Sequence, residues 1–298
     1  MSFGHHVMSP RENPNAMQNP SQNSESLMVT SFALSDRGQV RSRNEDQFLS
    51  AQVGQVVKVE QTSIPRYSPA VLQCANRGHL FVIADGLGGH AGGQKASALA
   101  VHLLVRWVRD CPQLIEDGGD LTARFEEVLH DADVRIGQEA GRHPEFKGMG
   151  TTLTMAYCWD RTLWIAHVGD SRAYLFRKGR MEQLTRDHTI VQDMIRAGLL
   201  KPEEVAQHIW RHVVTNVLGG TELGVRPEVH KFDLQPEDIL LLCSDGLTDL
   251  VTDEEIEEIL ANASDPRRAS EILIAKANQR GAPDNVTVLL ARFVQPVG

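Results

Sequence analysis

The order in which helices and strands are expected along the chain constrains its fold more than any other feature of the sequence. Apolar residues recur at helical spacing in two neighbouring segments, 96–107 and 125–136, and a second pair of helices is expected near 253–262 and 266–280. Short strands are grouped before, between and after these helix pairs, unlike the alternation of strand and helix in a doubly wound sheet. We therefore predict an α+β fold with two packed antiparallel β-sheets flanked by helix pairs, a four-layer α-β-β-α sandwich. The expected strands lie at 29–34, 47–51, 80–84, 151–158, 162–168, 172–177, 238–243 and 285–293.

The same pattern divides the chain into one large domain between two short tails. Residues 1–28 are polar and show no helical or alternating period, so we expect a flexible tail, and 294–298 form a second one. The domain spans 29–293. Within it, 52–78 is expected to be a ribbon or loop excursion, and the polar segment 185–226, with short helical stretches, is expected to be a semi-independent flap.

Charge and apolar content exclude several classes of function. The chain has 30 Lys and Arg against 39 Asp and Glu, a formal charge of −9, so it lacks the positive field that gathers nucleic acid. No apolar run approaches the roughly 20 residues that span a bilayer, and the N-terminus lacks the apolar centre of a secretory signal. We expect a soluble, cytoplasmic protein that binds neither nucleic acid nor a membrane.

The four cysteines argue against thiol chemistry. Cys74, Cys111, Cys158 and Cys243 are far apart and form no C-x-x-C pair, which suits reduced thiols rather than disulfides or structural zinc. None is followed six positions later by arginine, so the phosphate loop of a cysteine-dependent phosphatase would lack its cation.

Acidic residues recur at the ends of the expected strands, beside glycine or another small or polar residue. Any one of them would ordinarily make a turn or cap a helix. Together they suggest a site for a hard cation such as magnesium or manganese, because clustered carboxylates repel one another unless a cation lies between them. The five places are Glu45–Asp46, Asp85–Gly86, Gly169–Asp170, Asp245–Gly246 and Asp284–Asn285.

A glycine-rich run follows Asp85 and formally fits the G-x-G-x-x-G/A pattern of dinucleotide sites. Such a site needs a second parallel strand after the helix, whereas another long helix is expected here. The lysine-containing phosphate loop also fails, because Gln94 separates Gly93 from Lys95. A metal-ligating Asp85 fits better, since Gly86 lets a backbone carbonyl approach the same ion.

Six stretches in this order resemble the metal-dependent protein phosphatase family, type 2C, in its bacterial form. The resemblance covers about residues 29 to 293 and implies the two-sheet sandwich predicted above. The matching stretches are Ser35–Asp46, the run from Phe81 through Asp85 to Gly93, Gly148–Thr152, His167–Arg172, Cys243–Leu247 and Pro283–Asn285.

The resemblance implies a binuclear metal site at one end of the sandwich, loaded with two divalent cations, manganese or magnesium. Asp245 and Asp284 would complete the coordination of one cation. Glu45 or Asp46, with the backbone carbonyl of Gly86, would complete the other, and waters would fill the remaining positions.

Catalysis would centre on Asp85, which is implied to bridge the two cations. Water between the ions would be acidified and would attack phosphorus in line, so no Ser, Cys or His nucleophile is required. Arg41 would grip the substrate phosphate, because a guanidinium matches phosphate oxygens bidentately, although a lone arginine is more often simply solvated. Arg41, Asp46 and Asp85 are thus the expected catalytic residues.

Asp170 has two interpretations. By resemblance it corresponds to the ligand of a third, weaker cation that shares Asp245. Alternatively, it caps the turn at Gly169.

One position departs from the animal members of the family. Leu87 stands where they carry a histidine thought to protonate the leaving alkoxide, so the general acid is left open. Residues 150–152 and 171–172 are expected to serve folding rather than chemistry.

By resemblance, the substrates are phosphoserine and phosphothreonine proteins, and a serine/threonine kinase is the expected antagonist. Two alternatives keep the fold but change the function. One is an inactive phosphatase-fold sensing or scaffold module, which the intact acids disfavour. The other is a two-metal nucleotidase or nuclease, which the charge of −9 disfavours for nucleic acid.

Overall fold

The computed structural model describes residues 26–54, 56–64, 71–73, 78–88, 91–110, 121–220 and 224–296. Most of the expected tail at 1–28 and the end of the expected tail at 294–298 lie outside these residues, as do Cys74 and Cys111.

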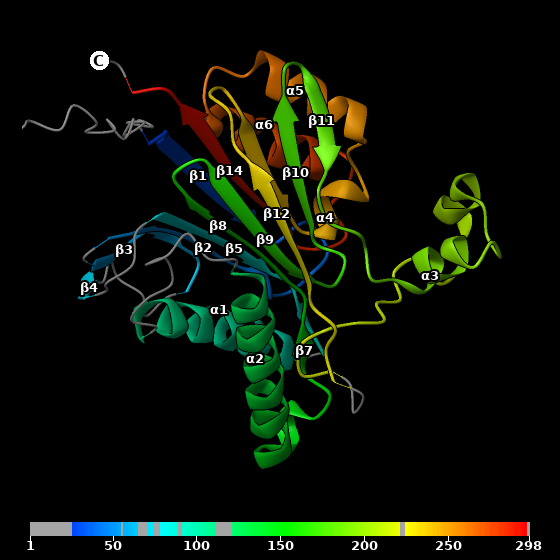
Figure 1. Cartoon of the computed structure of the whole chain (residues 1–298). Helices are drawn as coiled ribbons and strands as arrows, with labels where there is room; N and C mark the ends of the chain where they lie inside the picture. Colours follow the sequence, from blue (N-terminus) through cyan, green and yellow to red (C-terminus); the bar gives the residue numbers. More distant parts are fainter. Residues whose placement is uncertain are drawn as a thin grey trace, which may run out of the picture.

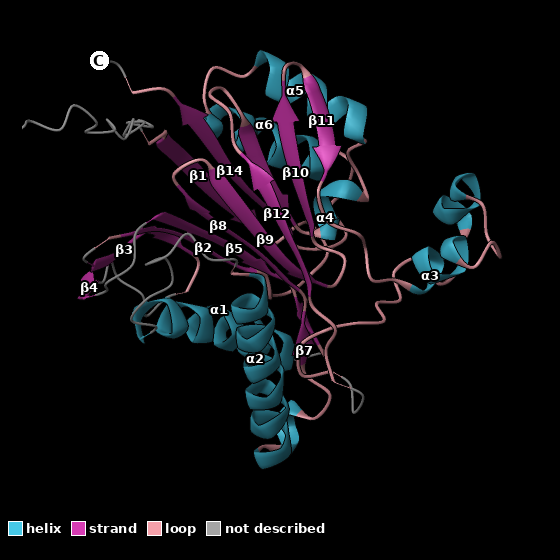
Figure 2. Ribbon diagram, viewed as in Figure 1, coloured by secondary structure: helices cyan, strands magenta, loops and turns pink. Residues whose placement is uncertain are grey.

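Two antiparallel sheets form the centre of the molecule (Figure 2). Each alternates apolar side chains toward the space between them, and this shared layer includes Phe81 and Ile165 from one sheet and Leu242 and Phe293 from the other. The first sheet has the order β1 (Met28–Asp36), β14 (Val286–Val294), β13 (Ile239–Cys243), β10 (Arg172–Arg177) and β11 (Arg180–Gln183). The second has the order β12 (Glu228–Asp233), β9 (Thr162–Val168), β8 (Leu153–Trp159), β5 (Gly78–Ala84), β2 (Gln47–Val53), β3 (Val56–Thr62) and β4 (Val71–Gln73).

Helices cover the outer face of each sheet (Figure 1). The long helices α1 (Gly92–Asp110) and α2 (Thr122–Arg142) pack their apolar stripes on the second sheet. On the first sheet lie α5 (Asp253–Asn262) and α6 (Pro266–Gln279), with the single turn α4 (Asp245–Thr248) at its edge. The predicted four-layer α-β-β-α sandwich is therefore confirmed.

The structure adds strands that the sequence pattern did not predict. The excursion at 52–78 contains β3 and β4, which extend the second sheet beyond β2. β11 and β12 are edge strands with many exposed polar residues, so they carry little of the apolar alternation that identifies a strand. A short ribbon of β6 (Gly86–Leu87) and β7 (Gly150–Thr151) follows the end of β5.

Within the segment predicted as a flap, residues 185–226, the part that carries α3 (Ile190–Arg196) projects from the sandwich (Figure 1). The segment also contains the 3-10 helix η2 (Pro202–Gln207), and a second 3-10 helix, η1 (Pro144–Phe146), follows α2 elsewhere in the chain. The bridge between Thr189 and Val214 holds its two limbs together where they leave the body. Among the described residues, no helix combines the length and the apolar character needed to cross a bilayer.

Truncation of Leu242 to alanine tests the layer between the sheets. Leu242 is fully buried, so Leu242→Ala should lower the free energy of unfolding by about 2–5 kcal/mol. Leu199→Ala is the matched control because Leu199 is 73% exposed. Denaturant unfolding of both variants measures the difference, and equal stabilities would contradict the assigned core.

Candidate active site

A cleft of about 790 Å³ opens where corresponding ends of the two sheets meet. Asp85 and Asp170 follow β5 and β9 of one sheet, while Asp245 follows β13 and Asp284 precedes β14 of the other. Because neighbouring strands are antiparallel, the end of one and the start of the next lie at the same edge. The predicted site residues that line the cleft are Arg41, Glu45, Asp85, Gly86, Asp170, Asp245 and Asp284.

Asp85 is held by its backbone, which leaves its carboxylate for the cleft. Its N–H donates to Thr152 Oγ1 at 3.0 Å, and its carbonyl accepts from the Thr152 N–H at 2.9 Å and from Thr151 Oγ1 at 2.8 Å. Thr152 Oγ1 in turn contacts Ser171 Oγ at 2.9 Å. The threonines assigned to folding therefore also position the expected bridging ligand.

Asp46 is 1% exposed and lies between the two sheets at the base of the site. Its Oδ2 accepts hydrogen bonds from Ser244 Oγ at 2.8 Å and Thr287 Oγ1 at 2.6 Å. Its Oδ1 has no hydrogen-bond partner among the described residues. Half of this buried carboxylate is thus available to a ligand.

Asn285 organises the loop before β2. Its Oδ1 accepts from the Glu45 N–H at 2.8 Å, and its Nδ2 donates to the Arg43 carbonyl at 2.9 Å. Its own N–H donates to Asp284 Oδ1 at 2.8 Å. Arg41, from the same loop, pairs through Nη2 with Asp284 Oδ2 at 2.6 Å. Arg41 and Glu45 therefore lie in the same cleft as Asp284, and the roles expected of them stay predictions.

Glycine is required where the chain after β5 meets the start of α1. A Cβ on Gly86 would lie 2.3 Å from the Gly93 carbonyl oxygen, and one on Gly93 would lie 2.7 Å from the Gly86 carbonyl oxygen. Real Cβ atoms do not approach so closely, so Gly86 and Gly93 allow close backbone packing beside Glu45.

Burial and mutual repulsion disfavour the ionised carboxylates. Burial, and then the charge of Asp46, raises the pKa of Asp85 well above its usual value; for Asp245, burial and then the charge of Asp170 have the same effect. Burial also raises the pKa of Asp46 to about 6, against the hydrogen bonds from Thr287 and Ser244.

These acids fit a divalent cation. Among the described residues, the buried Oδ1 atoms of Asp46 and Asp245 have no hydrogen-bond partner, and Arg41 contributes one positive charge at Asp284. Oxygen ligands of this kind are those that magnesium and manganese select, and a cation between them would turn repulsion into attraction.

Asp170 lies in the wall of the same cleft, 8% exposed, after Gly169 with its positive φ of 112°. Burial, and then the charge of Asp187, raises its pKa to about 7. Its proximity to Asp245 is compatible with a shared cation, and that role stays a prediction.

Three residues of the cleft were missed in the sequence. The flap brings Arg211 and His212 to its wall, and α4 brings Asp249. His212 Nδ1 lies 3.2 Å from Asp249 Oδ2, and these two residues with Asp245 place potential ligand atoms within 4.8 Å of one another. Asp249 follows Asp245 by one helical turn, a signal that could have identified it. No local pattern marks Arg211 or His212, because their position depends on the path of the flap.

Comparison with known proteins places this geometry in a family. The sequence profile of the protein phosphatase 2C family matches residues 70–278. The serine/threonine protein phosphatase PstP of Mycobacterium tuberculosis is 36% identical over 268 residues, which cover 90% of this chain and 46% of that protein. The chain thus spans about half the length of this curated relative. The serine/threonine phosphatase stp of Listeria monocytogenes is 32% identical over 86% of this chain and 92% of that protein.

Solved structures agree with the sequence comparison. The catalytic domain of PstP in complex with two manganese ions superposes with a TM-score of 0.71 at 35% identity, over 90% of this chain and all of that one. The phosphatase Stp1 of Staphylococcus aureus superposes with a TM-score of 0.74 at 32% identity, over 89% of this chain and 95% of that one.

The raised pKa values predict how stability depends on pH without metal. The folded protein retains protons on Asp170, Asp85 and Asp245 at pH values where the unfolded chain, with ordinary carboxyl pKa values near 3.9, has lost them. Stability therefore falls as pH rises through the folded-state pKa. In chelator, the melting temperature should fall between pH 7 and pH 8, a range in which histidines are mostly neutral in the unfolded chain.

Asp170→Asn tests the same argument, because it removes one raised pKa near 7 and should flatten this slope. Thermal melts of wild type and variant across the pH range measure it. A melting temperature that rises with pH in both proteins would contradict the electrostatic description of the cleft.

Proposed function

The chain belongs to the protein phosphatase 2C family, and from this premise we propose that it is a metal-dependent serine/threonine phosphoprotein phosphatase. The observation that carries the proposal is the convergence of buried, mutually repelling carboxylates at one cleft with an arginine on its wall. The relatives named as serine/threonine phosphatases support the substrate class, and the neighbour with two manganese ions supports the metal.

We assign the cation ligands to Asp46 or Glu45, Asp85, Asp245 and Asp284, with the carbonyl of Gly86. When bound, two divalent cations supply the acidity that lets water act as nucleophile at neutral pH, and they neutralise charge on the phosphoryl oxygens. Manganese and magnesium both suit these oxygen ligands.

The side chains of this chain hold the reacting groups in place. Thr151 and Thr152 fix the backbone of Asp85, so its carboxylate stays aimed at the cleft. Arg41 would bind the phosphate of the substrate through its guanidinium, which is 56% exposed and reaches Asp284 at the centre of the site. Asn285 keeps the Arg41 loop and Asp284 together, so the phosphate-binding and metal-binding groups move as one unit.

We further propose that Asp170 and Asp245 bind a third, weaker cation. This assignment rests on their common cleft and on the contribution of the Asp170 charge to the raised pKa of Asp245. The proposed antagonist is a serine/threonine kinase in the cytoplasm, a reducing compartment that suits the free, buried thiols of Cys158 and Cys243.

Removing one metal ligand should abolish hydrolysis without unfolding the protein. Asp245→Asn should lower turnover of a phosphothreonine peptide by at least about a hundredfold, since even outer partners of metal ligands are worth 10–100-fold. Chelator should abolish wild-type activity and manganese should restore it. The exposed acid Asp131, changed to Asn, is the matched control.

The melting temperature gives a second measurement on the same proteins. Manganese should raise it in wild type and Asp131→Asn, but much less in Asp245→Asn, because a ligand stabilises only the form that binds it. Full activity in excess chelator, or normal activity of Asp245→Asn, would refute the proposed centre.

Arg41→Ala should weaken binding of the phosphate. We expect kcat/KM for phosphopeptides to fall about tenfold, mainly through KM, because a charge-assisted bidentate contact is lost. Arg41→Lys should recover part of the loss, because it restores the positive charge but not the bidentate N–H donors of the guanidinium. Steady-state kinetics measure this, with Arg135→Ala on α2 as an exposed control. An unchanged kcat/KM in Arg41→Ala would exclude the phosphate role.

A further inference from the structure

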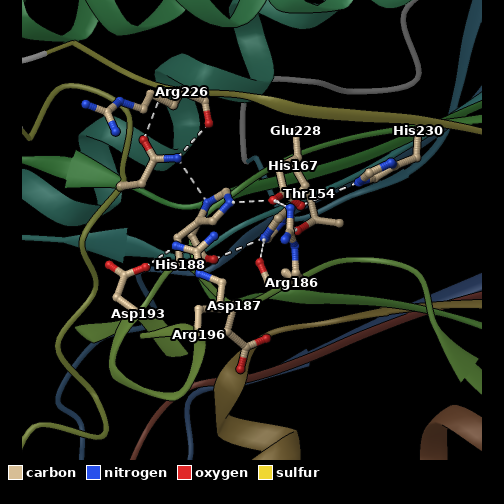
Figure 3. A network of polar contacts seen from close by, with 12 residues as sticks. Thr154, His167, Arg186, Asp187, His188, Asp193, Arg196, Arg226, Glu228 and His230 are labelled. Atoms are coloured by element: carbon tan, nitrogen blue, oxygen red, sulfur yellow. Dashed lines mark hydrogen bonds and ion pairs between the residues drawn. The ribbon is translucent and has the colours of Figure 1, made fainter. Parts of the chain in front are cut away.

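Two histidines contact both the flap and the loop that carries Asp170: His188, and His167, whose Nε2 lies 3.0 Å from the carbonyl oxygens of Gly169 and Arg186. The stem of the flap, defined as residues 185–190 and 213–218, leaves and rejoins the body beside this loop. His188 lies in the outgoing limb, in the polar network that Figure 3 shows. His188 is largely buried, with a side-chain exposure of 13%. It belongs to none of the ligands or phosphate-binding groups assigned above.

On one side His188 is bonded twice to Gly169, the residue before Asp170. Its backbone N–H donates to the Gly169 carbonyl at 2.7 Å, and its Nδ1 accepts from the Gly169 N–H at 3.1 Å. Gly169 packs closely against Thr152, because a Cβ there would lie 2.5 Å from Thr152 Cβ, and its φ of 112° favours glycine. The stem is therefore hydrogen-bonded to a closely packed loop of the body.

On the other side His188 is bonded to the returning limb of the flap. Its carbonyl accepts from the Thr215 N–H at 2.7 Å, and its Nδ1 lies 3.0 Å from Asn216 Nδ2. Asn216 also donates to the Arg226 carbonyl at 2.7 Å and accepts from the Arg226 N–H at 3.0 Å. One imidazole nitrogen thus links both limbs of the stem to the Asp170 loop.

These bonds fix the protonation of the ring. Two N–H donors face Nδ1, so that nitrogen carries no proton, and the proton lies on Nε2, 3.5 Å from Glu228 Oε1. Arg186 pairs with the same carboxylate, and the ring centroids of His167 and His188 are 4.9 Å apart. The exposed His230 contacts the other oxygen of Glu228 at 3.5 Å but does not reach the stem contacts described here (Figure 3).

We infer that His188 is a positioning residue that locks the stem of the flap to the Asp170 loop through its unprotonated Nδ1. The lock sets how Arg211 and His212, the flap residues in the cleft wall, face Asp245 and Asp249. Its effect on catalysis rests on the proposed function. A phosphoprotein must touch the wall that the flap supplies, whereas a small phosphomonoester needs only the base of the cleft. Loss of the lock should therefore lower turnover of large substrates and leave turnover of small ones nearly unchanged.

Two substitutions separate the role of Nδ1 from that of the ring. In His188→Asn the amide oxygen can stand where Nδ1 stood and accept the same hydrogen bonds, whereas in His188→Gln the amide lies one carbon further out, near the position of Nε2. Asn216→Ser leaves His188 in place and removes the side-chain contact of Nδ1 with the returning limb, together with the two bonds of Asn216 to Arg226, so it tests the lock without changing the imidazole. His230→Gln is the matched control, because it perturbs Glu228 from the exposed side.

Flap mobility is measured by trypsin cleavage after Arg196 and Arg211, both exposed in the flap, with cleavage after Arg267 in α6 as the internal reference. For His188→Gln and Asn216→Ser we expect flap cleavage to accelerate about tenfold and kcat/KM for a phosphothreonine protein to fall about tenfold. Turnover of p-nitrophenyl phosphate should stay within about twofold of wild type. His188→Asn and His230→Gln should resemble wild type.

Unchanged flap cleavage in His188→Gln would overturn the lock, as would a His188→Asn variant as impaired as His188→Gln. Equal loss on both substrates with faster cleavage after Arg267 would show general destabilisation and refute positioning. A wild-type protein that hydrolyses neither substrate with manganese would instead refute the proposed function, while the cleavage comparison would still decide the lock.

Discussion

Repulsion among the carboxylates where the two sheets meet is the constraint on which the rest of the structure depends. Asp46, Asp85 and Asp245 sit in positions where burial alone disfavours their charge, and each raises the cost for its neighbours. The fold keeps them there because their backbones are tied into strand ends and because apolar layers on both faces of each sheet stabilise those strands. Stability gained throughout the sandwich is thus used to hold a local arrangement that opposes folding until a cation binds.

Neutral hydroxyl groups make this arrangement possible. Thr152 accepts a hydrogen bond from the Asp85 backbone N–H and contacts Ser171, and Ser244 and Thr287 donate to Asp46. A hydroxyl donates a hydrogen bond without adding a positive charge, so it orients a carboxylate and leaves its charge for a metal. A lysine in the same place would neutralise the acid and compete with the cation. The small residues around the acids therefore belong to the design of the site as much as the acids do.

The sequence predicted the parts of this protein that depend on local periodicity. The helices α1, α2, α5 and α6 and the buried strands are marked by apolar spacing, and the acids are marked by their place at strand ends. β11 and β12 escaped because edge strands have too few buried positions to set a period. Arg211 and His212 escaped for a different reason. They reach the cleft through the path of the flap, which depends on contacts such as that between His188 and Gly169, nineteen positions apart.

The pairing of β1 with β14 has a consequence for how the protein is made. β1 is the first described strand, yet its partner β14 is the last described element of the chain. Likewise, Asp46 accepts a hydrogen bond from Thr287, which lies 241 positions later in the sequence. During synthesis the early strand therefore emerges with an unpaired edge, and contacts of such long range form late. Asp284 arrives with that last strand. A nascent chain interrupted before it lacks Asp284 and part of the cleft wall, so an unfinished protein has no complete set of acidic residues at this site.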